Sequence, residues 1–175
     1  MTGERLTPRI IERVGKSMNV KKYEMRVNEN SMPYLVMVGE TDISDAKSHR
    51  NSKAMAKIFR RAYHIDKLSE EHIYMMAFDK PGDLIGLFEL SRCTGQGHVI
   101  NPAQTMQCAM LVGAASICIA RNCHSDDVFP LAEDRKFAAA VEMAARVCRI
   151  KFYDYMLVAG SRKDAYYSFR LRANL

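Results

Sequence analysis

The hydrophobic residues of this chain recur with two different periods, and this pattern predicts a fold that mixes helices with strands. Thr7 and Pro8 are typical of a helix cap and first turn, and apolar residues follow them at helical spacing, which predicts a short helix over residues 7–18. A second helix is predicted from Ser52. Its buried face carries Met55, Ile58, Phe59 and Ala62.

Between these two helices the pattern predicts a hairpin. Tyr23–Val27 and Tyr34–Val38 are the predicted strands, and the turn-rich sequence NENSMP separates them. Residues 39–51 are polar and irregular, which predicts a surface loop or linker before the second helix.

From Glu71 onward the apolar residues form continuous runs, which is typical of buried strands. HIYMMAF and LIGLFEL flank a turn that contains Pro81 and Gly82, and this arrangement predicts a second hairpin. Asn101 and Pro102 predict the start of another helix. Its packing face carries Met106, Ala109, Met110 and Gly113.

The run Ala114–Ala120 is apolar on both faces, as expected of a central strand that helices cover. A helix is predicted next, and its inward side carries Phe137, Val141, Ala145 and Cys148. Phe152–Val158 is predicted to be a strand, and Tyr166–Phe169 a last one. This order of elements predicts an α/β fold, with a mixed sheet flanked by helices around one core.

The composition favours one intracellular domain. A chain of 175 residues with 48% hydrophobic content can close one core but is short for two. No apolar run approaches the ~20 residues that span a bilayer, and the N-terminal sequence lacks the apolar region of a signal peptide. The five cysteines form no CxxC pair and are odd in number, which favours reduced thiols. We therefore expect a soluble, cytoplasmic protein without a membrane partner.

The net charge of +6 is concentrated in the first third of the chain. Up to Arg61 there are thirteen Lys and Arg residues against seven Asp and Glu, whereas the remainder has thirteen of each. A basic segment can bind nucleic acid or an acidic partner, but acids interleave these bases and no aromatic-rich motif accompanies them. The pattern favours a solvated surface and leaves both kinds of partner open.

The polar segment from Arg121 to Asp134 is the first candidate for chemistry, because ligands of open α/β sheets usually bind beyond the C-terminal ends of strands. Here the central strand leads into RNCHSDDVFPLAED, which supplies thiol, imidazole, hydroxyl and carboxylate groups. Their spacing matches neither a zinc ribbon nor an HExxH helix. The alternative interpretation is a polar loop that caps the following helix.

Five positions fall at a recognisable spacing: Glu71, then Arg121-x-Cys123, seven residues, Leu131, two residues and Asp134. This order resembles the RadC-type branch of the JAB/MPN metallopeptidase superfamily. Domains of that family carry an early glutamate and then HxH, a serine and an aspartate at this spacing. The resemblance implies a JAB/MPN-like fold with a cytidine deaminase-like architecture.

Neighbouring positions follow the same family order. They are Asn122, Ser125, Pro130, Glu133, the pair Asp154-Tyr155 in place of a D-H dipeptide, and Tyr166-Tyr167-Ser168 near the end. The resemblance runs from about Leu68 to the C-terminus. It divides the chain into a basic N-terminal extension, residues 1–66, packed on a RadC-like domain, residues 67–175.

In active members of the family two imidazoles and a carboxylate hold Zn²⁺, and the early glutamate takes a proton from the bound water. The resemblance places Glu71 at that general-base position. Arg121 replaces the first imidazole, and its guanidinium has no free lone pair and would repel a dication. Cys123 and Asp134 make two ligands where three are usual, and Leu131 lacks the hydroxyl of the family serine. We therefore expect neither bound zinc nor family-like hydrolysis.

Two further arrangements are possible with these residues. His124 is a candidate rescue ligand, but adjacent residues on an extended chain point in different directions. Alternatively, Arg121 supplies the positive charge in place of the metal. It would then bind Asp134 through two hydrogen bonds and reach Glu71.

Two classes of function stay open. The first is a catalytically silent JAB/MPN-like domain that binds or scaffolds a protein, a nucleic acid or a second copy of itself, with a link to DNA repair that the resemblance implies. The second is a metallopeptidase-like hydrolase with altered ligands, in which Cys123 is a zinc ligand or a nucleophile beside His124. A zinc nucleobase deaminase is excluded, because the sequence has neither HxE nor PCxxC.

Overall fold

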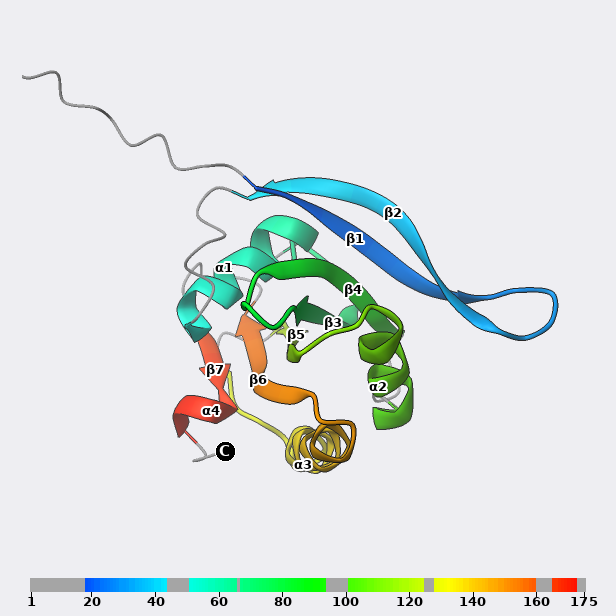
Figure 1. Cartoon of the computed structure of the whole chain (residues 1–175). Helices are drawn as coiled ribbons and strands as arrows, with labels where there is room; N and C mark the ends of the chain where they lie inside the picture. The colour runs from blue at the N-terminus through cyan, green and yellow to red at the C-terminus, as the bar shows by residue number, and fades with distance from the viewer. Residues whose placement is uncertain are drawn as a thin grey trace, which may run out of the picture.

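The computed structural model describes residues 18–43, 51–65, 67–93, 101–124, 128–159 and 165–172. Its strands are β1 (Met18–Val27), β2 (Pro33–Ile43), β3 (Glu71–Phe78), β4 (Leu84–Cys93), β5 (Ser116–Cys123), β6 (Lys151–Ala159) and β7 (Tyr166–Ser168). Its helices are α1 (Ser52–Tyr63), α2 (Pro102–Leu111), α3 (Ala132–Val147) and α4 (Phe169–Arg172) (Figure 1). The helix predicted over residues 7–18 lies outside the described residues, except for Met18, which begins β1.

The strands of the described residues form one mixed sheet in the order β2-β1-β4-β3-β5-β6-β7. β1 pairs with β4, and β5 with β6, in parallel, and the other neighbouring strands are antiparallel. β5 therefore lies inside the sheet, as its apolar sequence predicted. The predicted α/β class with a mixed, helix-flanked sheet is confirmed.

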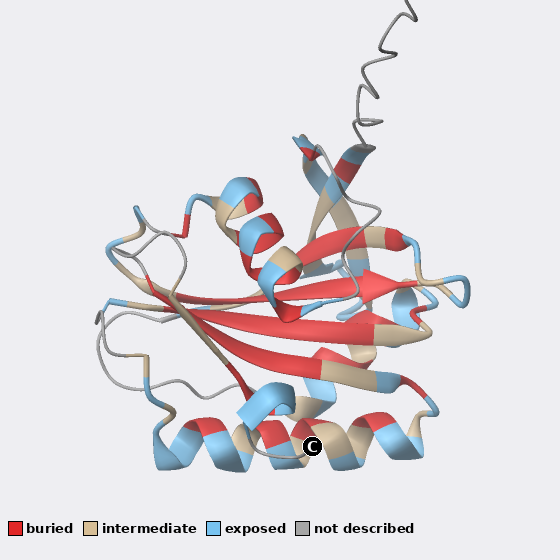
Figure 2. Cartoon of the chain, turned by 90° about the vertical axis from the view of Figure 1, so that its left-hand side faces the viewer, coloured by how far each residue is buried: buried red, intermediate tan, exposed pale blue. Residues whose placement is uncertain are grey.

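Helices cover both faces of the sheet (Figure 2). α1 packs on one face, where Phe59 joins a core that includes Met76 of β3. α2 and α3 pack on the other face, where Val141 joins a core that includes Met75 of the same strand. Successive residues of a strand point to opposite faces, so one apolar strand serves both cores.

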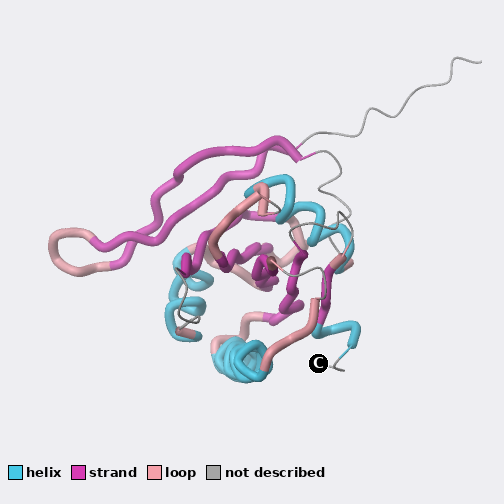
Figure 3. The backbone as a smooth tube through the Cα atoms, turned by 180° about the vertical axis from the view of Figure 1, so that it is seen from behind, coloured by secondary structure: helices cyan, strands magenta, loops and turns pink. Residues whose placement is uncertain are grey.

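The β1–β2 hairpin carries the sheet outward beyond the body of the domain (Figure 3). The segment Lys22–Glu24 of β1 pairs with β4, whereas β1 pairs with β2 along its whole length. Several large apolar side chains of the hairpin are exposed: Val27, Met32, Tyr34, Met37 and Val38. The hairpin thus belongs to the same sheet as the other strands, and the boundary between residues 66 and 67 stays a prediction.

Several expectations from the sequence were wrong. Residues 39–43 are not a loop but continue β2, because Ile43 is buried in the core on the α1 side. The central strand does not end at Ala120 but runs to Cys123, because the charge of Arg121 is neutralised inside the fold.

Met110 does not pack inward and is 55% exposed. Each residue of a helix is rotated by about 100° from the one before it, and this rotation places Met110 outside the buried face of α2. That face consists of Thr105, Met106, Cys108 and Ala109.

In the described part of the chain, none of the helices is long and apolar enough to cross a membrane. α3 has 16 residues, and Ala138, Val141 and Ala145 form its buried side. α4 is a single turn that begins at Phe169, where the sequence predicted the end of a strand.

Candidate functional site

Three charged residues from separate elements meet at one end of the sheet. Arg121 lies near the end of β5, Glu71 begins β3, and Asp134 lies in the first turn of α3. β3 and β5 are antiparallel neighbours, with Ile73 opposite Arg121, so the start of one strand lies beside the end of the other. The sheet topology thus places Glu71 beside the arginine, and the first turn of α3 supplies Asp134.

The Arg121 guanidinium binds both acids. Its Nε donates to Oδ1 of Asp134 at 3.0 Å and its Nη2 donates to Oδ2 at 2.8 Å, which makes a bidentate ion pair. Its Nη1 donates to Oε1 of Glu71 at 3.1 Å. The side chains of Arg121 and Asp134 are only 4% and 6% exposed, and that of Glu71 is 36% exposed. The predicted pairing of Arg121 with both acids is confirmed.

The carboxylate of Asp134 accepts four hydrogen bonds, two at each oxygen. Besides the arginine, Oδ1 accepts from the hydroxyl of Tyr155 at 2.8 Å, and Oδ2 accepts from the backbone N–H of Leu131 at 2.9 Å. These donors use the lone pairs that a carboxylate offers in its plane. The negative charge also lies in the first turn of α3, where its interaction with the helix dipole stabilises the helix.

The surroundings fix the protonation states of the donors. Burial alone would lower the pKa of Arg121, but the hydrogen bonds to Asp134 and the negative charges nearby raise it above its ordinary value. Burial raises the pKa of Tyr155, and the charge of Asp134 raises it further. Arg121 is therefore a permanent cation, and Tyr155 is a neutral phenol that donates its hydrogen bond to Asp134.

Asn122 follows Arg121 in β5 and fixes the start of β3. Its Oδ1 accepts from the backbone N–H of His72 at 2.6 Å, and its Nδ2 donates to the carbonyl of Glu70 at 2.8 Å. These two residues flank Glu71, so Asn122 holds the backbone of Glu71 beside the arginine. The sequence placed Asn122 in the family register but gave no sign of this role. In the structure Asn122 is 1% exposed, which is unusual for an amide within a strand.

The other predicted site residues do not join the ion pair through their side chains. Leu131 precedes α3 with its side chain 61% exposed, Cys123 is half-buried at the end of β5, and His124 is exposed beyond it. Within the described ranges no three His, Cys, Asp or Glu side chains are grouped so that they could hold a metal ion. The oxygens of Asp134 already accept hydrogen bonds, and a guanidinium separates it from Glu71. These residues do not fit a zinc ion.

A second buried carboxylate, Asp154 of β6, links the C-terminal elements to α1. Its Oδ2 accepts from the hydroxyls of Ser52 and Ser168 at 2.7 and 2.6 Å, and its Oδ1 accepts from the backbone N–H of Arg170 at 3.0 Å. Burial raises the pKa of Asp154 above its ordinary value of 3.8, and these hydrogen bonds oppose the rise only in part. Family spacing drew attention to Asp154 and Ser168, but Ser52 could be identified only from the structure.

The mixed sheet, the helices on both faces and the acids around the end of β5 agree with a JAB/MPN-like fold. A family model described as the RadC-like JAB domain matches residues 49–174, most of the chain. The chain therefore belongs to the RadC-like JAB domain family. A search of curated proteins found no match.

Replacement of Arg121 with methionine is expected to lower the free energy of unfolding by about 3–5 kcal/mol, because it leaves the buried carboxylate of Asp134 without a counter-charge. The double variant Arg121→Met/Asp134→Leu should lose less than the sum of the two single losses, since both remove the same ion pair. Chemical denaturation measures this coupling. Arg146→Met is the control, because its ion pair with Glu142 lies on the surface and contributes little. Strictly additive losses would contradict the assignment.

The raised pKa of Asp154 predicts a specific pH dependence. The folded protein holds this proton more tightly than the unfolded chain, so stability falls as the pH rises from the unfolded to the folded pKa. We expect the free energy of unfolding of the wild type to fall relative to that of Asp154→Asn as the pH rises from about 4. Urea denaturation at several pH values measures the difference, with exposed Asp83→Asn as the control. Parallel curves for wild type and Asp154→Asn would refute this prediction.

Proposed function

We propose that this RadC-like JAB domain does not hydrolyse peptide bonds and instead acts as a binding or scaffold module. The observation that supports this most directly is the bidentate contact of Arg121 with Asp134, at 3.0 and 2.8 Å. The family resemblance assigns the position of Arg121 to an imidazole that ligates zinc. A guanidinium has no lone pair for a metal, but it supplies positive charge to the same acids.

Hydrolysis by a metal-bound water needs an ion that lowers the pKa of the water toward ~7, a base that takes its proton, and a donor for the oxyanion. Glu71, at the position of the family's base, accepts a hydrogen bond from Arg121. Leu131, at the position of the family's serine, has no side-chain donor and is turned to solvent. The metal and the oxyanion donor thus meet residues that lack the needed groups, and the carboxylate at the position of the base is engaged by the guanidinium.

The β1–β2 hairpin supports a role in binding. β2 lies at one edge of the sheet, and its side chains Tyr34, Met37 and Val38 are exposed. An edge strand with exposed apolar residues is typical of contact with another protein chain. Charges on β1 also pair locally, as Arg26 does with Glu24 at 3.0 Å. These features favour a protein partner or a second copy for the hairpin, and the link to DNA repair rests on the resemblance alone.

Zinc content tests the proposal. After dialysis against zinc and then against buffer, the wild type is expected to retain far less than one ion per chain, because its donor set is incomplete. The variant Arg121→His/Cys123→His/Leu131→Ser restores the family's residues and is expected to retain about one ion per chain. Elemental analysis measures the metal, and a fluorogenic isopeptide substrate measures hydrolysis in the same samples.

Arg135→His is the matched control, because it adds an imidazole on the exposed side of α3, away from the acids. It should leave the zinc content unchanged. Stoichiometric zinc in the wild type that is lost in Cys123→Ser, with cleavage that stops on chelation, would overturn the proposal and support a hydrolase with altered ligands.

A further inference from the structure

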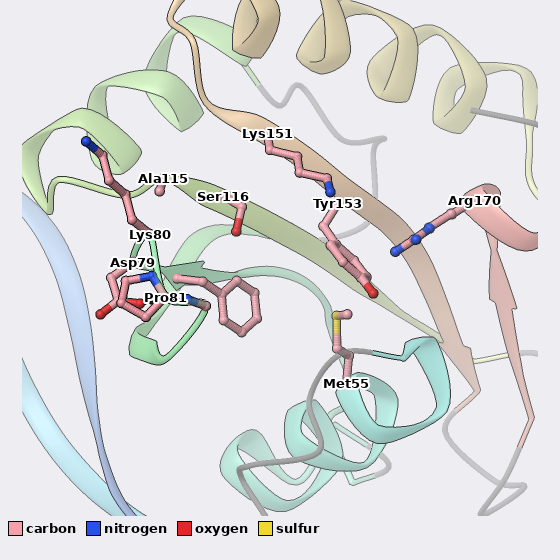
Figure 4. A pocket seen from close by; sticks show the side chains of 11 residues that line it. Met55, Asp79, Lys80, Pro81, Ala115, Ser116, Lys151, Tyr153 and Arg170 are labelled. Carbon is pink, nitrogen blue, oxygen red and sulfur yellow. Dashed lines mark hydrogen bonds between the residues drawn. The ribbon is translucent and has the colours of Figure 1, made fainter.

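A cavity of about 470 Å³ lies at the opposite end of the sheet from Arg121. It is bounded by the β3–β4 turn, the first residues of β5 and β6, and parts of α1 and α4 (Figure 4). Ser116 begins β5 and lines the cavity, whereas Arg121 lies toward the other end of that strand. The volume is within the range of small-molecule sites, roughly 300–1,000 Å³.

Two cations converge on one aromatic ring in this cavity. The guanidinium carbon of Arg170 lies 4.2 Å from the ring centroid of Tyr153, and Nζ of Lys151 lies 5.8 Å from the same centroid. Figure 4 shows the two side chains directed toward that ring from α4 and β6. Both distances are typical of cation–π contacts. The cavity therefore has a positively charged side built on a half-buried tyrosine.

The acids nearby leave these cations without a carboxylate partner. Asp79 lines the cavity, but its Oδ1 accepts two backbone N–H groups of its own turn. Asp154 acts electrostatically on Arg170 but is buried outside the lining, with its oxygens bound to serine hydroxyls and a backbone N–H. Among the described residues no carboxylate forms an ion pair with Lys151 or Arg170. Lys80 adds a third positive charge to the lining.

The lining indicates the chemistry of a ligand. Two neighbouring cations suit a phosphate, whose oxygens accept charge-assisted hydrogen bonds. Exposed Pro81 and half-buried Tyr153 line the same cavity and offer an apolar surface on which a planar ring can pack. Met55 and Phe78 also line it but are almost fully buried. A ligand that uses both parts carries a phosphate group and a flat, apolar ring.

We propose that this cavity binds a phosphate ester with a planar base, of the size of a nucleoside monophosphate, with the phosphate held by Lys151 and Arg170. A free nucleotide and the phosphorylated end of a single strand both present this group. The cavity and the ion pair of Arg121 lie at opposite ends of the sheet. Binding here is therefore independent of whether the domain hydrolyses peptide bonds.

Calorimetric titration of the full chain with AMP, inorganic phosphate and adenosine tests the proposal. AMP should bind at least about 10-fold more tightly than either fragment, because only AMP reaches both the cations and the apolar surface. Its affinity should also fall as salt is added, since exposed charges are screened. Phosphate that binds as tightly as AMP, or AMP that shows no binding at millimolar concentration, would overturn the proposal.

Charge reversal locates the site. Lys151→Glu and Arg170→Glu should each weaken AMP binding about 10- to 100-fold, because each removes a charge-assisted donor. Lys136→Glu makes the same charge change on the exposed side of α3 and should leave the affinity within about two-fold. Thermal unfolding checks that each variant is folded, and Lys151 is exposed, so its replacement leaves the core intact. Equal losses in Lys136→Glu and Lys151→Glu would refute the site.

A single-stranded oligonucleotide with a 5′-phosphate identifies the source of the ligand. Tighter binding of this strand than of AMP, lost without the phosphate and in Arg170→Glu, assigns the cavity to a strand end. Binding of AMP that equals or exceeds that of the strand assigns it to a free nucleotide.

Discussion

Both oxygens of a buried carboxylate, Asp134, accept hydrogen bonds from the guanidinium of Arg121, and the rest of the site is arranged around this ion pair. Burying two charges costs several kcal/mol for each ion, which good geometry and satisfied lone pairs must offset. The hydroxyl of Tyr155 and the N–H of Leu131 satisfy the remaining lone pairs of the carboxylate, and Glu71 takes a further guanidinium donor. A metal ion would need these same oxygens, so the ion pair and a bound metal exclude each other.

The sheet gives this ion pair its setting and separates it from the second cavity. β5 lies between β3 and β6, with Arg121 and Asn122 near its end. Asn122 holds the start of β3, which places Glu71 within reach of the guanidinium. At the other end of the same strand, Ser116 lines a cavity whose cations come from β6, α4 and the β3–β4 turn. One strand thus connects a cluster in which one guanidinium faces two carboxylates with a cavity lined by three cations and one carboxylate.

Hydrophobic periodicity was sufficient to predict the order of most helices and strands, because burial on one or both faces leaves a clear pattern. The pairing of Arg121 with Asp134 was also predictable, since family spacing placed a permanent cation among acids. The roles of Asn122, Tyr155 and Ser52 were not, because each depends on a partner far away in the chain and on the direction of one side chain. Residues 39–43 were misassigned because this C-terminal half of an edge strand is largely polar up to Ile43 and resembles a loop.

A crystal structure of the protein from zinc-soaked crystals, with anomalous diffraction data at the zinc edge, tests most directly whether a guanidinium stands in place of the metal. We expect Nε and Nη2 of Arg121 within hydrogen-bonding distance of both Asp134 oxygens, and no anomalous peak beside them. A zinc ion bound by Asp134 and Cys123, with Arg121 turned to solvent, would contradict the proposal that the guanidinium replaces the metal.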